Sequence, residues 1–216
     1  MSVSTRRRSY LRADERRRQI LDVAKGVFAR RGYHRANVAH ICEAARIGRG
    51  TLYQYFDNKQ AVMEALLDDI AARIGEVLDS RPRVPDMVRV GGALPARDLI
   101  VGFCRRRLHL LLSVVFSDED MLRLVFREAR GLSGSLERTL ARIDEVILRA
   151  LETDLRAAQD AKLLRAGNTR VFARFILGGI EKVILSALLA DEPIDLDEVT
   201  RLAVDLELFG LLEGPK

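Results

Sequence analysis

The chain has 216 residues, and its formal net charge of +5 is unevenly divided: residues 1–60 carry +9 (14 basic and 5 acidic side chains), and the rest carries −4. A cationic segment joined to a mildly acidic body indicates a polyanionic partner. With 31% charged and 48% apolar residues and only two cysteines, the composition excludes a disordered chain and a disulfide scaffold.

Four helices are predicted in the N-terminal third from the spacing of apolar residues. The first ends at Gly32, and the second covers residues 38–45 with Asn37 as its N-cap. A very short third helix is expected over residues 49–56. A longer fourth helix follows Asn58, which is expected to cap it.

About five more helices are predicted after a break rich in Pro and Gly at residues 81–95. No segment shows the alternation of a β-strand, so an all-α chain of about nine helices is expected. We divide it into a helix-turn-helix domain over residues 1–60 and a helical regulatory domain over residues 61–216. The later helices are expected over 96–116, 119–130, 136–164, 169–189 and 196–212.

The second and third helices have the plan of a helix-turn-helix. In the third, Leu52 and Phe56 form an apolar inner face, and the remaining positions are crowded with hydrogen-bonding side chains around Gly50. Gly weakens a helix by about 1 kcal/mol relative to Ala. Its presence in the first turn indicates that a partner approaches the backbone there, as DNA does when a helix enters its major groove.

The segment over roughly residues 15–66 resembles the DNA-binding domain of the TetR (tetracycline repressor) family. The resemblance depends on Gly32-Tyr33, Val38-x-x-Ile41, Ala44-Ala45, Gly50-Thr-Leu-Tyr-x-Tyr-Phe56 and Asn58-Lys59. It implies a homodimer that binds a palindromic operator on double-stranded DNA. The remaining 150 or so residues resemble the family only in the number and length of their helices.

The resemblance implies a role for each DNA-contacting residue. Arg49 would read guanine O6 and N7, and Gln54 would suit adenine, while Gly50 permits close approach. Lys59 would contact a phosphate, and Asn37 would bring backbone N–H groups and its side chain to another. Contacts with phosphates or thymine methyls are implied for Thr51, Tyr53 and Tyr55.

Four residues depart from the family's usual pattern. Ala36 replaces Thr and removes one phosphate contact, and Cys42 replaces Ala and is expected to be buried. Arg46 replaces a turn Gly, so we expect a non-Gly residue at positive φ, with an added phosphate contact as a further role. Gly48 replaces the Ser cap of the third helix.

Arginines are concentrated before the first helix, at Arg6–Arg8, Arg12 and Arg16–Arg18. Attraction to phosphates is the favoured role for this arm. A solubilising tail and insertion into the minor groove remain open alternatives.

The resemblance implies a cavity for a small apolar or amphipathic ligand in the second domain. His109 and Glu128 are its candidate polar anchors. For any single candidate a core position is favoured over a pocket position, and His109 is then a hydrogen-bonded histidine in the core or at its edge. The candidate apolar residues are Phe103, Phe116, Met121, Phe126 and Phe175.

The last two helices have the apolar faces expected of a dimer interface. The first of them is apolar around much of its surface and contains Gly178 and Gly179, which permit close helix approach. A core within one chain is the alternative. The candidate interface residues are Phe172, Ile176, Gly179, Ile180, Val183, Leu202, Leu206 and Phe209.

The sequence predicts a cytoplasmic transcriptional regulator, a repressor released from its operator by a ligand. A DNA-binding activator or architectural regulator without ligand control is one alternative. An all-α lipid-binding protein or enzyme with a fortuitous helix-turn-helix is another. No nucleophile elbow, P-loop, dinucleotide motif, metal-ligand spacing or membrane span is recognised, so no catalysis, cofactor, metal or membrane is expected.

Overall fold

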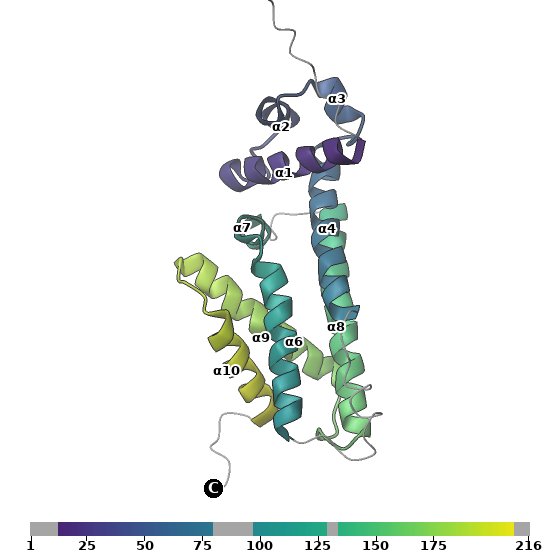
Figure 1. The fold of residues 1–216 in the computed structure, drawn as a ribbon, viewed down its shortest axis with the longest axis vertical. Helices are drawn as coiled ribbons and strands as arrows, with labels where there is room; N and C mark the ends of the chain where they lie inside the picture. Colours follow the sequence, from purple (N-terminus) through teal and green to yellow (C-terminus); the bar gives the residue numbers. More distant parts are fainter. Residues whose placement is uncertain (1–12, 80–96, 129–133, 210–216) are drawn as a thin grey trace, which may run out of the picture. The chain divides into compact units, whose positions relative to one another are not determined.

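The computed structural model of the chain describes residues 13–79, 97–128 and 134–209. Within these ranges the protein consists of nine α-helices without a strand (Figure 1), which confirms the all-α prediction. The helices are α1 (Ala13–Arg31), α2 (Val38–Ala45), α3 (Arg49–Tyr53), α4 (Lys59–Asp79), α6 (Arg97–Phe116), α7 (Glu119–Glu128), α8 (Ser135–Asp160), α9 (Thr169–Ala190) and α10 (Leu196–Phe209). The predicted break at 81–95 lies outside the described residues, as do Arg6–Arg8 and Arg12 of the predicted basic arm. Arg16–Arg18, which the prediction placed before the first helix, belong to α1.

Two helices are shorter than predicted, for local reasons. The predicted third helix reaches Phe56, but α3 ends at Tyr53 because the N–H groups of both Tyr55 and Phe56 bond to the carbonyl of Leu52 and close a turn. The helix predicted to end at Leu164 ends at Asp160. There Lys162 adopts a left-handed φ of 58° and redirects the chain.

The chain divides into two compact units, the first ending at Leu66 and the second beginning at Leu67. In the first unit α1 packs on α2, and α2 packs on α3. The apolar residues that predicted these helices form the core, with Ile20, Phe28, Ile41 and Leu52 fully buried. Complementary charges support α1, since acidic residues occupy its first turn and basic residues its last.

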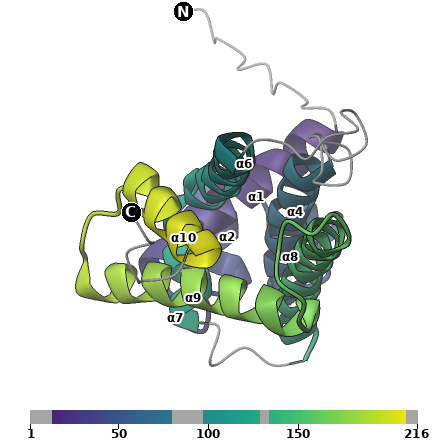
Figure 2. The ribbon, with the colours of Figure 1, turned by 90° about the horizontal axis from the view of Figure 1, so that it is seen from below.

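The second unit has two apolar clusters. In one, Ile74 and Leu78 of α4 pack with Ile147 of α8. In the other, Leu112 of α6 packs with Leu122 of α7 and Ile184 of α9. Figures 1 and 2 show α6 and α10 side by side, and α8 contacts α9. None of the described helices is long and apolar enough to cross a membrane.

Charged groups also lie inside the second unit. Arg107 of α6 pairs with Asp154 of α8, and each side chain is only 13% exposed. Beside this pair, burial and the neighbouring carboxylates of Glu207 and Asp154 raise the pKa of the Cys104 thiol to about 11. The thiol is therefore protonated at neutral pH and is a poor nucleophile.

Candidate nucleic-acid interface

The N-terminus of α2 is closed by two reciprocal hydrogen bonds. Asn37 Oδ1 accepts from the His40 N–H at 3.0 Å, and His40 Nδ1 accepts from the Asn37 N–H at 3.3 Å. Asn37 is confirmed as the N-cap, whereas its histidine partner was not predicted, because this capping box usually carries Glu or Gln. The side chain of Asn37 is used in the cap, where it accepts from the His40 N–H. An anion would therefore bind to the other N–H groups in the first turn of α2.

The turn between α2 and α3 contains the expected residue at positive φ. Arg46 adopts φ 54° and ψ 45°, and the Ile47 N–H bonds to the Cys42 carbonyl at 3.0 Å. A left-handed residue of this kind ends a helix and is usually Gly. The turn therefore has the backbone geometry that a Gly usually provides between two such helices. Arg46 adds an exposed guanidinium at this position, where Gly has no side chain.

Helix α3 has a buried face and an exposed face. Leu52 is fully buried and Phe56 nearly so, and the guanidinium of Arg17 lies over the Phe56 ring at 5.3 Å. On the other side Arg49, Gly50, Tyr53 and Gln54 are exposed, and Thr51 and Tyr55 are half-buried at the margins. The exposed set combines a guanidinium, an amide and a phenol on one short helix, which are groups that read base edges and phosphates.

The two glycines of this segment are not required by packing within the chain. A Cβ atom built at Gly48 or Gly50 has no neighbour within 4 Å. Gly48 also provides no side-chain cap for α3. The protein itself would thus tolerate a larger residue at position 50. This agrees with an external partner that approaches the backbone there.

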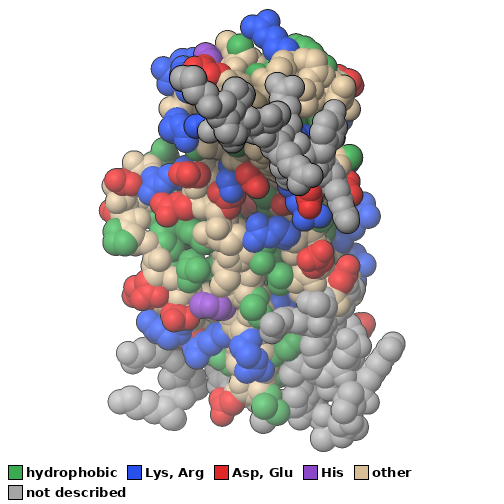
Figure 3. All heavy atoms as spheres, turned by 45° about the horizontal axis from the view of Figure 1, so that its top comes forward, with side chains coloured by type: hydrophobic (Ala, Val, Ile, Leu, Met, Phe, Trp, Pro, Cys, Tyr) green, Lys and Arg blue, Asp and Glu red, His purple; other side chains and the backbone are tan. Residues whose placement is uncertain are grey.

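Basic side chains appear at several places on the surface of the first unit, which is drawn at the top of Figure 3. Among the predicted contacts Lys59 is different, because its ammonium group is bonded to three backbone carbonyls of this unit. Sequence reasoning could not find these bonds, since Lys59 lies 23–26 residues from its acceptors.

The seven residues predicted to line a ligand pocket do not form one group. Met121 is buried, and Phe116 and Phe126 pack against the cluster around Leu112. His109 lies 3.1 Å from Asp197, at the start of α10. Phe103 is half-buried, and the side chain of Glu128 lies outside the described residues.

Phe175 is the residue that departs most from the pocket prediction, because its side chain is 77% exposed on α9. Helical spacing places it in an outward row with Val171, Gly178 and Gly179. Its aromatic character suggested a buried role, but the face of a helix that meets the core is decided by its neighbours.

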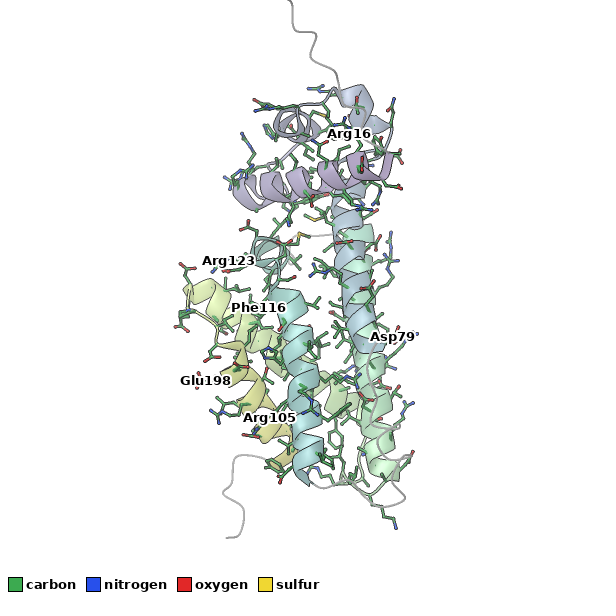
Figure 4. All side chains as sticks on the ribbon, in the orientation of Figure 1. Arg16, Asp79, Arg105, Phe116, Arg123 and Glu198 are labelled. Atoms are coloured by element: carbon green, nitrogen blue, oxygen red, sulfur yellow. The ribbon has the colours of Figure 1, made fainter. Side chains whose placement is uncertain are left out.

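A cavity of about 420 Å³ lies beside α7 and the segment between α9 and α10. Phe116, Leu188 and Ile194 contribute apolar walls, and Arg123 is held in its wall by Asp191 at 2.9 Å. Figure 4 labels both Phe116, the last residue of α6, and Arg123, in the middle of α7. Of the seven predicted pocket residues, Phe116 is the one that lines this cavity.

Helices α9 and α10 both expose apolar faces within the single chain. Of the predicted interface residues, Val183, Leu202, Leu206 and Phe209 are 41–50% exposed, and a Cβ at Gly179 would meet nothing within 4 Å. Phe172, Ile176 and Ile180 are half-buried. The sequence prediction omitted three further exposed residues of α9: Val171, Phe175 and Leu189.

Comparison with known proteins relates these features to one family. Residues 20–66 match the family model described as "Bacterial regulatory proteins, tetR family". The chain is 23% identical over 198 residues to the fatty acid metabolism regulator protein of Bacillus subtilis, covering 89% of this chain and 94% of that protein. It is 32% identical over 123 residues to the transcriptional repressor KstR2 of Rhodococcus jostii, covering 52% and 60%.

A solved structure has the same fold over nearly the whole chain. It is the transcriptional regulator FadR of Bacillus subtilis in complex with stearoyl-CoA, with a TM-score of 0.69 and 20% sequence identity. The match covers 90% of this chain and 99% of that one. The helices of the second unit, which lie outside the family match, therefore also follow the fold of that structure.

Proposed function

We propose that the chain, whose residues 20–66 match the tetR family of bacterial regulatory proteins, is a sequence-specific repressor of that family that a small ligand releases from DNA. The observation that carries this proposal is the outward face of α3 and its C-cap, where Arg49, Gly50, Tyr53 and Gln54 are exposed and Leu52 is buried on the opposite side. The protein acts by binding rather than by catalysis, and its action on DNA implies a cytoplasmic location.

Residues 1–60 provide the DNA-binding domain, and residues 61–216 provide regulation and dimerisation. The exposed apolar faces of α9 and α10 support a two-fold dimer, because such faces are stable when they cover each other. The dimer presents two copies of α3 to half-sites about 34–36 Å apart on a palindromic operator.

Selection of bound sequences from random DNA tests this function. We expect the wild type to enrich a palindrome and Arg49→Ala to lose preference at one position in each half-site, since a bidentate contact with guanine discriminates by about 1–3 kcal/mol. Gln60→Ala, at an exposed position of α4, is the control and should enrich the same palindrome. Enrichment of no sequence by the wild type would exclude a sequence-specific regulator.

The proposed ligand is a long-chain acyl thioester bound in the second unit. Two observations support this ligand class: the name of the Bacillus relative refers to fatty acid metabolism, and the FadR structure contains stearoyl-CoA. Release from DNA requires that the ligand bind the DNA-free arrangement better than the DNA-bound one.

We expect stearoyl-CoA to raise the melting temperature of the protein and to weaken its binding to the operator. A ligand at 100 times its Kd stabilises the folded state by about 2.7 kcal/mol, which corresponds to roughly 5–11 °C for a chain of this size. Free coenzyme A, which lacks the acyl chain, is the control. An unchanged melting temperature with the thioester would contradict this ligand class.

A further inference from the structure

The ammonium group of Lys59 is bound within the first unit by the backbone. Nζ donates to the carbonyl oxygens of Tyr33 at 2.8 Å, Ala36 at 3.0 Å and His34 at 3.3 Å. An ammonium group has three N–H donors, so three acceptors match its whole donor capacity.

An aromatic ring lies against the same ammonium group. Nζ is 4.3 Å from the centroid of the Tyr33 ring, a favourable cation–π distance. That ring is itself fixed, because Tyr33 is only 7% exposed and packs edge-on against Phe28 with 5.6 Å between the ring centroids. Lys59 thus occupies a formed site made of three carbonyls and one ring.

The three carbonyls belong to the turn that leads into α2. Ala36 directly precedes Asn37, the N-cap of α2, and Lys59 is the first residue of α4. A cation at the N-terminus of a helix is opposed by the helix dipole. The carbonyls of the α1–α2 turn offset this repulsion and join the start of α4 to the start of α2.

We propose that Lys59 is a positioning residue that fixes the α1–α2 turn, and with it the N-terminus of α2, for DNA binding, rather than a phosphate contact. This inference rests on the proposed function, and it gives Lys59 a role different from the phosphate contact expected from the sequence. Lys59 would affect DNA binding indirectly, by fixing the backbone of residues 33–37. A movement of the first turn of α4 would therefore be transmitted to the N-terminus of α2.

The two roles of Lys59 predict different salt dependences. A lysine that contacts a phosphate contributes about one unit to the slope of log K against log salt concentration. A lysine that acts through the backbone contributes nothing to that slope. Lys59→Met keeps the aliphatic stem and removes the three donors, so it separates the two roles in the full-length protein.

We expect Lys59→Met to weaken binding to the selected operator roughly tenfold at every salt concentration, with an unchanged slope. In the DNA-free protein the amides of residues 36–40 should exchange hydrogen faster. Lys59→Arg should share both effects, because a planar guanidinium does not match three carbonyls grouped around one nitrogen. Arg35→Met removes a charge from the same turn but none of these bonds, so exchange at 36–40 should not change.

A slope reduced by about one with unchanged amide exchange would overturn the proposal and restore the phosphate contact. Full rescue of affinity by Lys59→Arg would also overturn it. If the wild type binds no operator, the proposed function fails, and exchange in the DNA-free protein still decides whether Lys59 holds the turn.

Discussion

Phe175→Asp is expected to convert the dimer into monomers and to lower operator affinity by about 100- to 10,000-fold, the gain that comes from linking two binding modules. A two-fold interface carries the change twice, and burial of two unpaired carboxylates opposes association. The side chain is 77% exposed in the single chain, so the monomer should keep its fold. Light scattering after size exclusion measures the oligomeric state, circular dichroism measures the helical fold, and operator titration measures the affinity for DNA.

Leu99→Asp is the matched control for this prediction. Leu99 is 58% exposed on α6, a helix that does not belong to the interface we propose for α9 and α10. It introduces the same charge at an exposed apolar position and should leave the dimer and its DNA binding intact. A Phe175→Asp protein that remains dimeric would refute the proposed interface.

Asp154→Ala is expected to lower the free energy of unfolding by about 3 kcal/mol, the usual cost of breaking a buried ion pair from one side. Arg107 would remain 13% exposed without its carboxylate partner. For a chain of this length the melting temperature should fall by roughly 6–12 °C. Chemical denaturation and thermal melting of the ligand-free protein measure both quantities.

The exposed pair between Arg149 and Glu145 provides the comparison. These side chains are 77% and 38% exposed, so Glu145→Ala should change the free energy of unfolding far less than Asp154→Ala, although it also removes the 3.7 Å contact with Arg170. Replacing both buried partners, as Arg107→Met with Asp154→Leu, should recover most of the loss, because an apolar pair needs no charge compensation. If Asp154→Ala and Glu145→Ala lowered the free energy of unfolding equally, burial of the Arg107–Asp154 pair would not make that pair more important for stability.

Several features that depend on residues close in sequence were predicted correctly, although the ends of α3 and α8 and the part of His40 in the α2 cap were not. The apolar spacing around Ile20 and Phe28 predicted α1, Asn37 was recognised as a cap, and the positive φ of Arg46 followed from a missing turn Gly. The inward position of Leu52 on α3 was likewise predicted. Each of these follows from interactions within about one or two helical turns.

Features that depend on which helices meet were not predicted. The sequence did not indicate that His109 lies beside Asp197, and Phe175 was expected inside but is exposed in the single chain. Both residues are on amphipathic helices with apolar groups on more than one side. For such helices, the spacing of apolar residues does not determine which side faces the core.

The sequence by itself determined the all-α class, the helix-turn-helix and the residues that α3 presents, because helix periodicity and caps are local properties of the chain. The tertiary structure decided the partners of the charged groups. Lys59 and Tyr33 are 26 residues apart, and Arg107 and Asp154 are 47 apart. Residues so far apart in the sequence come into contact only when whole helices pack together, so no local sequence pattern predicts these pairs.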